Sequence, residues 1–195
     1  MIPAQTALVR GLQVIVMTRT KEKRKLRTGR KPHDSIARLT AALASKNGVE
    51  RQHAREALVQ LGESAVPPLI AALQDERERV RWEAAKAFTA LHAPAAAPAL
   101  ARTLADKDGD VRWLAAEALV GLRDAALVPL LETLTTHAGS TELCQGAHHV
   151  LRTLNRGDLA AIVGRVLTAL EHCEPELVAP VSAEVALEQL KQRAS

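Results

Sequence analysis

The sequence predicts an all-α fold, a right-handed α-solenoid of about five antiparallel helix pairs. The main observation is a repeat, because residues 80–91, VRWEAAKAFTAL, return 31 residues later as residues 111–122, VRWLAAEALVGL. Composition agrees, since 47% of the residues are hydrophobic but only 2% are aromatic, which leaves Ala, Leu and Val to build the core. Small and aliphatic side chains favour closely stacked helices. Residues 13–17 are the only candidate strand, and they are few.

Each repeat is predicted to contain two helices, a first helix opened by proline and a second helix opened by Val-Arg. Pro67, Pro98 and Pro129 lie 31 residues apart, and proline is favoured at a helix start because its missing N–H would have no partner there. Asn47-Gly48 predicts a turn, and Gly62 lies at a C-cap position. The expected pairs are 36–45 with 49–61, 67–74 with 80–91, 98–105 with 111–122, 128–137 with 141–154, and a looser 159–172 with 180–192.

Residues 1–33 do not share the repeat and are predicted to be a disordered basic tail in front of a repeat domain at 34–195. The tail holds nine Lys or Arg against Glu22, a balance of +8, and the whole chain is +4, so the repeat domain carries −4. One interpretation is an electrostatic arm for nucleic acid or an anionic membrane. The other is a solvated leader, added by a start codon upstream of Met17. No aromatic residue interleaves the basic ones, so base stacking is not expected.

The sequence favours a cytoplasmic protein without a membrane partner. Residues 12–17 are too few to span a bilayer, and Arg10 interrupts what would be the core of a signal peptide. Two cysteines, Cys144 and Cys173, do not make a disulfide framework and suit a reducing compartment.

An aspartate precedes the arginine of Val-Arg by six residues in the two middle repeats. The pairs are Asp75 with Arg81 and Asp106 with Arg112. With this feature, residues 35–192 resemble HEAT repeats of the short type shared with phycobilisome lyases. The resemblance implies that these four residues are structural and form a polar ladder along the stack. Ser45 and Ala138 replace the aspartate in the first and fourth repeats, so the ladder is expected only in the middle.

No catalytic, cofactor-binding or metal-binding residue is expected. His148-His149 with Glu142 comes nearest to a metal site, but neighbouring residues on a helix point about 100° apart, whereas zinc helices space their ligands four apart. The alternative is one histidine packed at a repeat interface and one at the surface. The sequence contains no Gly-rich phosphate loop after a strand and no nucleophile elbow.

Trp82 and Trp113 occupy the same position of consecutive second helices, which the resemblance places on the concave face of a solenoid. Exposed indoles there would be anchors for a partner, whereas packed indoles would cover the ladder, and the sequence leaves both open. Glu83 and Glu117 make this face acidic and unsuited to phosphate. We therefore expect a non-enzymatic scaffold that binds a protein or peptide through these four residues. The alternatives are nucleic-acid association through the tail, and a lyase-like or chaperone-like role implied by the resemblance.

Overall fold

The structure is a computed structural model that describes residues 32–137, 139–172 and 174–194. The chain divides into two units, residues 1–38 and residues 39–195. Residues 1–31 of the predicted tail lie outside the described residues, and so does the strand candidate at 13–17. Helix α2 (Pro32–Ala42) begins two residues before the expected start of the repeat domain at residue 34.

The described part of the second unit consists of helices joined by short turns. The helices that follow α2 are α3 (Gly48–Leu61), α4 (Val66–Ala72), α5 (Glu78–Leu91), α6 (Ala97–Thr103), α7 (Gly109–Leu122), α8 (Leu127–His137), α9 (Thr141–Leu154), α10 (Ala160–Leu170) and α11 (Pro175–Ala194). Helix α4 packs on α5, α6 on α7, α8 on α9 and α10 on α11, so the second to fifth predicted pairs form. The all-α solenoid expected from the repeat is confirmed.

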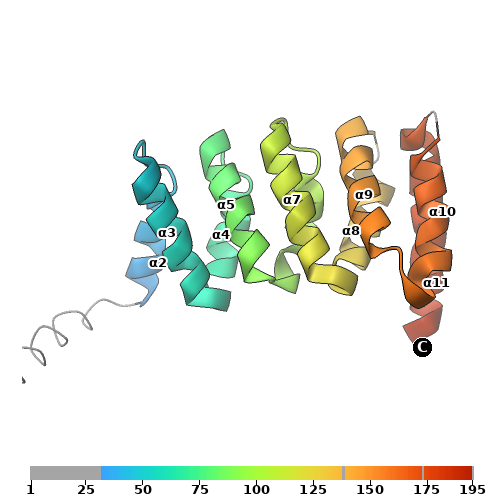
Figure 1. Cartoon of the computed structure of the whole chain (residues 1–195), viewed down its shortest axis with the longest axis horizontal. Coiled ribbons are helices and arrows are strands. Elements are labelled where there is room, and N and C mark those ends of the chain that lie inside the picture. The colour runs from blue at the N-terminus through green and yellow to red at the C-terminus, as the bar shows by residue number, and fades with distance from the viewer. Residues whose placement is uncertain (1–31, 138, 173, 195) are drawn as a thin grey trace, which may run out of the picture. The chain divides into compact units, whose positions relative to one another are not determined.

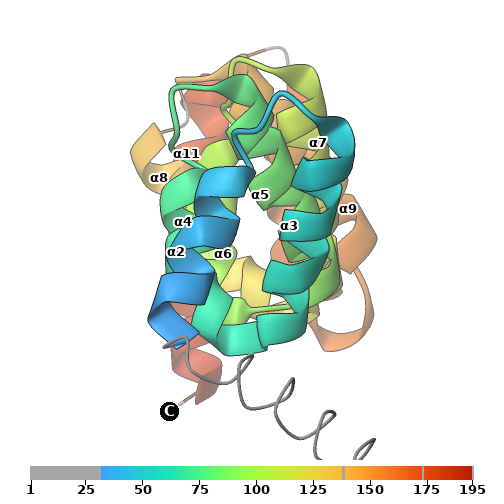
Figure 2. The same ribbon diagram turned by 90° about the vertical axis from the view of Figure 1, so that its left-hand side faces the viewer.

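These helices form two layers. Helices α3, α5, α7 and α9 pack side by side in chain order (Figure 1). Figure 2 views the stack from its end. Helices α4, α6, α8 and α11 form the second layer, on the opposite side from α3, α7 and α9. Equivalent positions of successive repeats therefore lie beside one another within a layer, as in other helical repeat proteins.

The second helices α3 and α7 begin earlier than the predicted valine, because a polar side chain caps each of them. Asn47 Oδ1 accepts a hydrogen bond of 2.9 Å from the backbone N–H of Val49, and Asp108 Oδ1 accepts one of 2.9 Å from Val111. The capping oxygen satisfies one of the unpaired N–H groups of the first turn. Helix α3 consequently begins one residue before the predicted valine and α7 two, and α5 also begins two residues early although Arg77 at its N-cap makes no side-chain cap.

The repeated prolines lie in the first turn of the first helices, but none is the first residue. Helix α4 begins at Val66, before Pro67, and α6 begins at Ala97, before Pro98. A one-turn 3₁₀ helix precedes each of them and was not predicted. Proline fits all the same, because the first four N–H groups of a helix have no partner within it.

The core between the layers is built mainly from alanine and leucine. Ala84, Ala115, Leu119 and Leu130 have no exposed surface, and Phe88, the single phenylalanine of the sequence, is only 2% exposed. Alanine allows two helices to approach closely, and leucine fills the space between them. Of the described helices, none combines the length and the apolar character needed to cross a lipid bilayer.

The last helix pair departs from the repeat. The sequence expected its second helix to open at Pro180, but α11 begins at Pro175 and carries Pro180 inside. Helix α11 packs mainly on α8 and α10, so it continues the layer of first helices, whereas α10 packs on α9. Ala179 and Ala183 make this contact possible, since neither retains any exposed surface.

Candidate functional site

The two tryptophans lie on the layer formed by α3, α5, α7 and α9, whose surface we call the second-helix face. Trp82 is on α5 and Trp113 is at the equivalent position of α7. Despite this equivalence, Trp113 is 56% exposed whereas Trp82 is half-buried. The repeat therefore places two identical side chains in register but gives them different surroundings.

Trp113 stands beside a histidine of the next repeat. Its ring lies 5.0 Å from the ring of His149, centroid to centroid, with the planes inclined by 47°. His149 Nε2 is in turn 3.1 Å from Glu117 Oε1, one helical turn after the tryptophan. This tilted contact supports one edge of the indole and leaves more than half of its surface to solvent.

A groove runs between α7 and α9 below this aromatic pair. It has a volume of about 230 Å³, and Trp113, His149, Arg112, Glu142, Gln145 and Gly146 contribute to its walls. Glu142 is exposed, and its pKa is lowered because its own backbone N–H and the Ser140 hydroxyl donate hydrogen bonds to it. The groove thus combines an exposed indole and Arg112 from α7 with the Glu142 carboxylate from α9.

Trp82 has a different neighbour, because Arg55 of the preceding repeat lies over it. The guanidinium carbon of Arg55 is 5.8 Å from the centre of the indole ring, within the range of a cation–π contact. This arrangement agrees with the packing interpretation for Trp82. Trp82 is thus packed against the preceding repeat, whereas Trp113 remains more than half exposed.

The structure corrects the expected place of Glu83. Its side chain is held by Arg51, whose Nε lies 3.0 Å from Oε1, and by Arg55, which donates to Oε2. Glu83 is only 3% exposed, so its carboxylate binds two arginines of the preceding repeat and is not presented to a partner. A buried carboxylate needs such partners, because an unpaired one is strongly destabilising. The sequence contained both arginines, but nothing marked them as partners of Glu83.

One pair of the predicted ladder connects neighbouring repeats. Arg81 Nε is 2.7 Å from Asp106 Oδ2 and its Nη2 is 3.0 Å from Oδ1, a two-pronged contact between almost fully buried side chains. The hydrogen bond to Asp106 raises the pKa of Arg81. Arg81 Nη1 also donates to the carbonyl oxygens of Asp75 and Glu76, so the side chain joins the turn between α4 and α5 of its own repeat to Asp106 of the next repeat.

The outer members of the ladder bind within their own repeat. Asp75 pairs with Arg77 through two side-chain hydrogen bonds of 2.8 Å, and these hydrogen bonds lower its pKa to about 2. Arg112 donates to the carbonyl oxygens of Asp106 and Lys107. The ladder stops there because Arg51 binds Glu83 instead of Asp75, and because Ala138 offers no carboxylate to Arg112.

The adjacent histidines point to different partners. His148 Nε2 lies 3.2 Å from Glu171, the residue that follows α10, and His149 Nε2 lies 3.1 Å from Glu117 of α7. Within residues 32–137, 139–172 and 174–194, no three His, Cys, Asp or Glu side chains gather closely enough to hold a metal ion.

A family model described as HEAT repeats matches residues 36–120 and, in an overlapping second match, residues 66–152. The chain is a HEAT-repeat protein. No curated protein matched it.

Solved structures include other helical repeat proteins. This HEAT-repeat chain is 26% identical to a chain in the structure of the complex of CpcE and CpcF of phycocyanin lyase from Nostoc sp. PCC7120, with a TM-score of 0.53. The match covers 78% of this chain and 98% of that one. Crystal structures of two engineered proteins match with 21% and 22% identity and TM-scores of 0.44 and 0.42, over 80% and 79% of this chain and 79% and 80% of theirs.

Proposed function

We propose that this HEAT-repeat protein is a non-enzymatic scaffold that binds a protein or peptide segment on its second-helix face. The observation that carries the proposal is Trp113, a tryptophan that is 56% exposed beside a groove. Interface anchors are enriched in tryptophan, and such an anchor contributes most when the partner buries it fully. His149 supports the ring from one side, so little side-chain freedom is lost when a partner covers it.

The charged residues around the two tryptophans have opposite signs, which favours a partner segment whose own charged residues have a defined order. Helix α5 carries the exposed Lys86 one turn after Trp82, whereas α7 carries Glu117 one turn after Trp113. The positions three residues before the tryptophans reverse in the same way, with Arg79 on α5 and Asp110 on α7. The proposed segment therefore places an apolar side chain at Trp113, a basic residue toward α7 and α9, and an acidic residue toward α5.

Paired affinity capture tests this proposal. The wild-type chain, a Trp113→Ala variant and a Val128→Ala variant serve as baits in the same lysate, and the captured proteins are identified by mass spectrometry. Val128 is 43% exposed on α8, in the other layer, so it controls for the loss of any exposed apolar side chain. We expect a discrete protein that the wild type and Val128→Ala capture and Trp113→Ala does not. Equal capture by all three baits would remove Trp113 from the binding surface.

A lyase-like or chaperone-like role is a second candidate, and the similarity to the phycocyanin lyase complex supports it. The match extends over 98% of a chain in that two-protein complex, so this chain has a comparable extent of repeats. The role would require binding of a bilin, the linear tetrapyrrole that such an enzyme handles. We expect a shift of the bilin absorption band on addition of the purified protein if this role is correct. An unchanged spectrum at millimolar protein would exclude it.

A further inference from the structure

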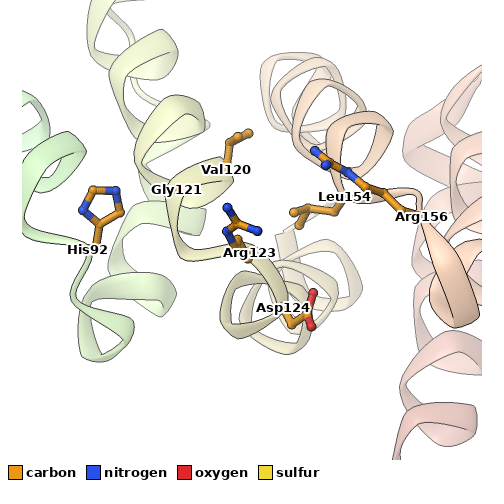
Figure 3. Close-up of a pocket in the computed structure, with 7 residues that line it drawn as sticks. All are labelled: His92, Val120, Gly121, Arg123, Asp124, Leu154 and Arg156. Atoms are coloured by element: carbon orange, nitrogen blue, oxygen red, sulfur yellow. The ribbon is translucent and has the colours of Figure 1, made fainter.

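A pocket lies at the ends of α5, α7 and α9, away from the groove beside Trp113. Its volume is about 500 Å³, and its polar lining consists of His92, Arg123, Asp124 and Arg156, with Val120 and Leu154 as apolar walls. We call it the helix-end pocket. Figure 3 shows the Arg123 and Arg156 side chains reaching from two sides toward the space between Val120 and Leu154, while the Asp124 carboxylate points elsewhere.

Two of these basic residues occupy backbone positions that suit glycine. Gly62, His92 and Arg123 are the first residues after α3, α5 and α7, and all three have a positive φ. Gly62 has φ 61° and ψ −134°, and Arg123 has nearly the same conformation, φ 55° and ψ −129°. This region is almost exclusively occupied by glycine, so an arginine there reduces the stability of the fold. This strained backbone conformation places the cationic side chain of Arg123 in the lining of the pocket.

A glycine also positions His92. A Cβ atom at Gly121 would lie 3.1–3.2 Å from the imidazole ring, so a larger residue there would displace the ring by a few tenths of an ångström from its place against the last turn of α7. His92 Nδ1 additionally lies 3.0 Å from the carbonyl oxygen of Ala90. The imidazole is therefore held at the edge of the pocket, next to the loop that carries Arg123.

Among the side chains that the structure describes, which do not include that of Asp158, the guanidinium groups of the pocket have no carboxylate partner. Arg156 donates through Nε to the carbonyl oxygen of Thr153 at 3.0 Å, and Arg123 forms no ion pair there. Asp124 is not ion-paired with either of them. By contrast, Arg51, Arg55 and Arg81 are all paired with acids of neighbouring repeats.

We propose that the helix-end pocket binds a phosphate group. A guanidinium matches phosphate with two parallel hydrogen bonds, and two guanidinium groups balance the two negative charges of a phosphate monoester. Arg123 and Arg156 contact the phosphate oxygens, and His92 adds a third donor from the α5 side. Val120 and Leu154 face whatever organic group carries the phosphate. This site is separate from the second-helix face and does not depend on the function proposed for it.

Isothermal titration calorimetry of the full chain tests this site, with inorganic phosphate and glycerol 3-phosphate as probes at constant ionic strength. We expect wild type to bind, and Arg123→Gly and Arg156→Gln each to weaken binding by at least about tenfold. Tighter binding of glycerol 3-phosphate would indicate an organic phosphate, and equal affinities would indicate phosphate itself.

Two features of the variants separate binding from folding. Arg123→Gly should melt at the same temperature as wild type or higher, because glycine accepts the backbone conformation without strain. Arg102→Gln, which removes an exposed arginine from α6, should bind phosphate as wild type does. Absence of binding by the wild type, or undiminished binding by Arg123→Gly and Arg156→Gln, would overturn the proposal.

Discussion

Polar side-chain contacts connect the first four repeats, and each connection uses different chemistry. In chain order, the contacts are Arg51 with Glu83, Arg81 with Asp106, and Glu117 with His149. The first two are largely buried, whereas both side chains of the third are about 40% exposed, at 42% and 39%. Buried pairs are costly to break because the remaining partner keeps its charge without compensation, whereas an exposed pair contributes little.

Replacing Glu83 by Gln should therefore destabilise the fold. The variant leaves Arg51 and Arg55 without a carboxylate at a site that is only 3% exposed, so we expect a loss of about 2–4 kcal/mol in the free energy of unfolding. Urea unfolding followed by circular dichroism measures it. Glu56→Gln on the same surface is the control, because Glu56 is exposed and should cost less than about 0.5 kcal/mol. Equal effects of the two variants would contradict the role assigned to Glu83.

Asp75 gives a prediction that depends on pH. Its hydrogen bonds from Arg77 lower its pKa from 3.8 to about 2, so the ionised form stabilises the folded chain at neutral pH. That stabilisation is present above pH 4 and disappears as the pH falls from about 4 to 2. Asp75→Asn should lose up to about 1 kcal/mol at pH 7, since Arg77 is well exposed, and progressively less below pH 4. A difference between variant and wild type that stays constant from pH 7 to 3 would show that the ion pair is not its cause.

At the scale of elements, short first helices and longer second helices give the two layers different roles. Helices α4 and α6 have 7 residues each, whereas α3, α5, α7 and α9 have 14. A 3₁₀ turn precedes α4, α6, α8 and α10 and continues directly into each of them. The longer helices supply a continuous layer, and both tryptophans lie on it. The last helix, α11, instead joins the layer of first helices.

A larger side chain at Ala183 tests the place of α11. Ala183 has no exposed surface, so Ala183→Leu must push α11 away from its neighbours and should destabilise the chain by about 1–3 kcal/mol. Val181→Leu is the matched control, since Val181 is 62% exposed on the same helix and should tolerate the change. Thermal unfolding of both variants against wild type gives the result. Equal melting temperatures for Ala183→Leu and wild type would mean that α11 does not pack as described.

The sequence predicted the positions of the helices better than the surroundings of individual side chains. The 31-residue recurrence located α5 and α7 to within two residues at their starts, because repeated apolar positions must face the same core. It did not predict the start of α11, because proline suits a helix start and Pro180 lies five residues inside. It also could not separate Trp82 from Trp113. Their exposure depends on Arg55 and His149, which belong to other repeats and lie 27 and 36 residues away.

At the scale of the whole repeat domain, each repeat contacts mainly its neighbours, so stability is distributed over a row of interfaces. The interface between the second and third repeats carries the buried pair of Arg81 and Asp106. Weakening one interface in such a row allows the two sides to unfold separately, whereas a single globular core would unfold as a whole.

A double-mutant cycle measures this interface. Arg81→Ala and Asp106→Ala should each destabilise the chain, and the double variant should lose less than the sum, with a coupling of about 1–3 kcal/mol. The single variants should also unfold over a broader range of urea, because the repeats on the two sides no longer unfold together. Additive losses would show that the two side chains do not act as a pair, and an unchanged transition width would show that this interface does not couple the repeats.

The most direct test of the second-helix face is the affinity of the captured partner for Trp113→Ala, measured by calorimetry beside its melting temperature. We predict a loss of at least about 2 kcal/mol in binding free energy, roughly thirtyfold in Kd, because the partner buries an indole that solvent now contacts. The melting temperature should stay within about 2 °C of wild type, since an exposed side chain contributes little to folding. Unchanged affinity would contradict the account, and so would a large fall in melting temperature, which would make Trp113 a packing residue.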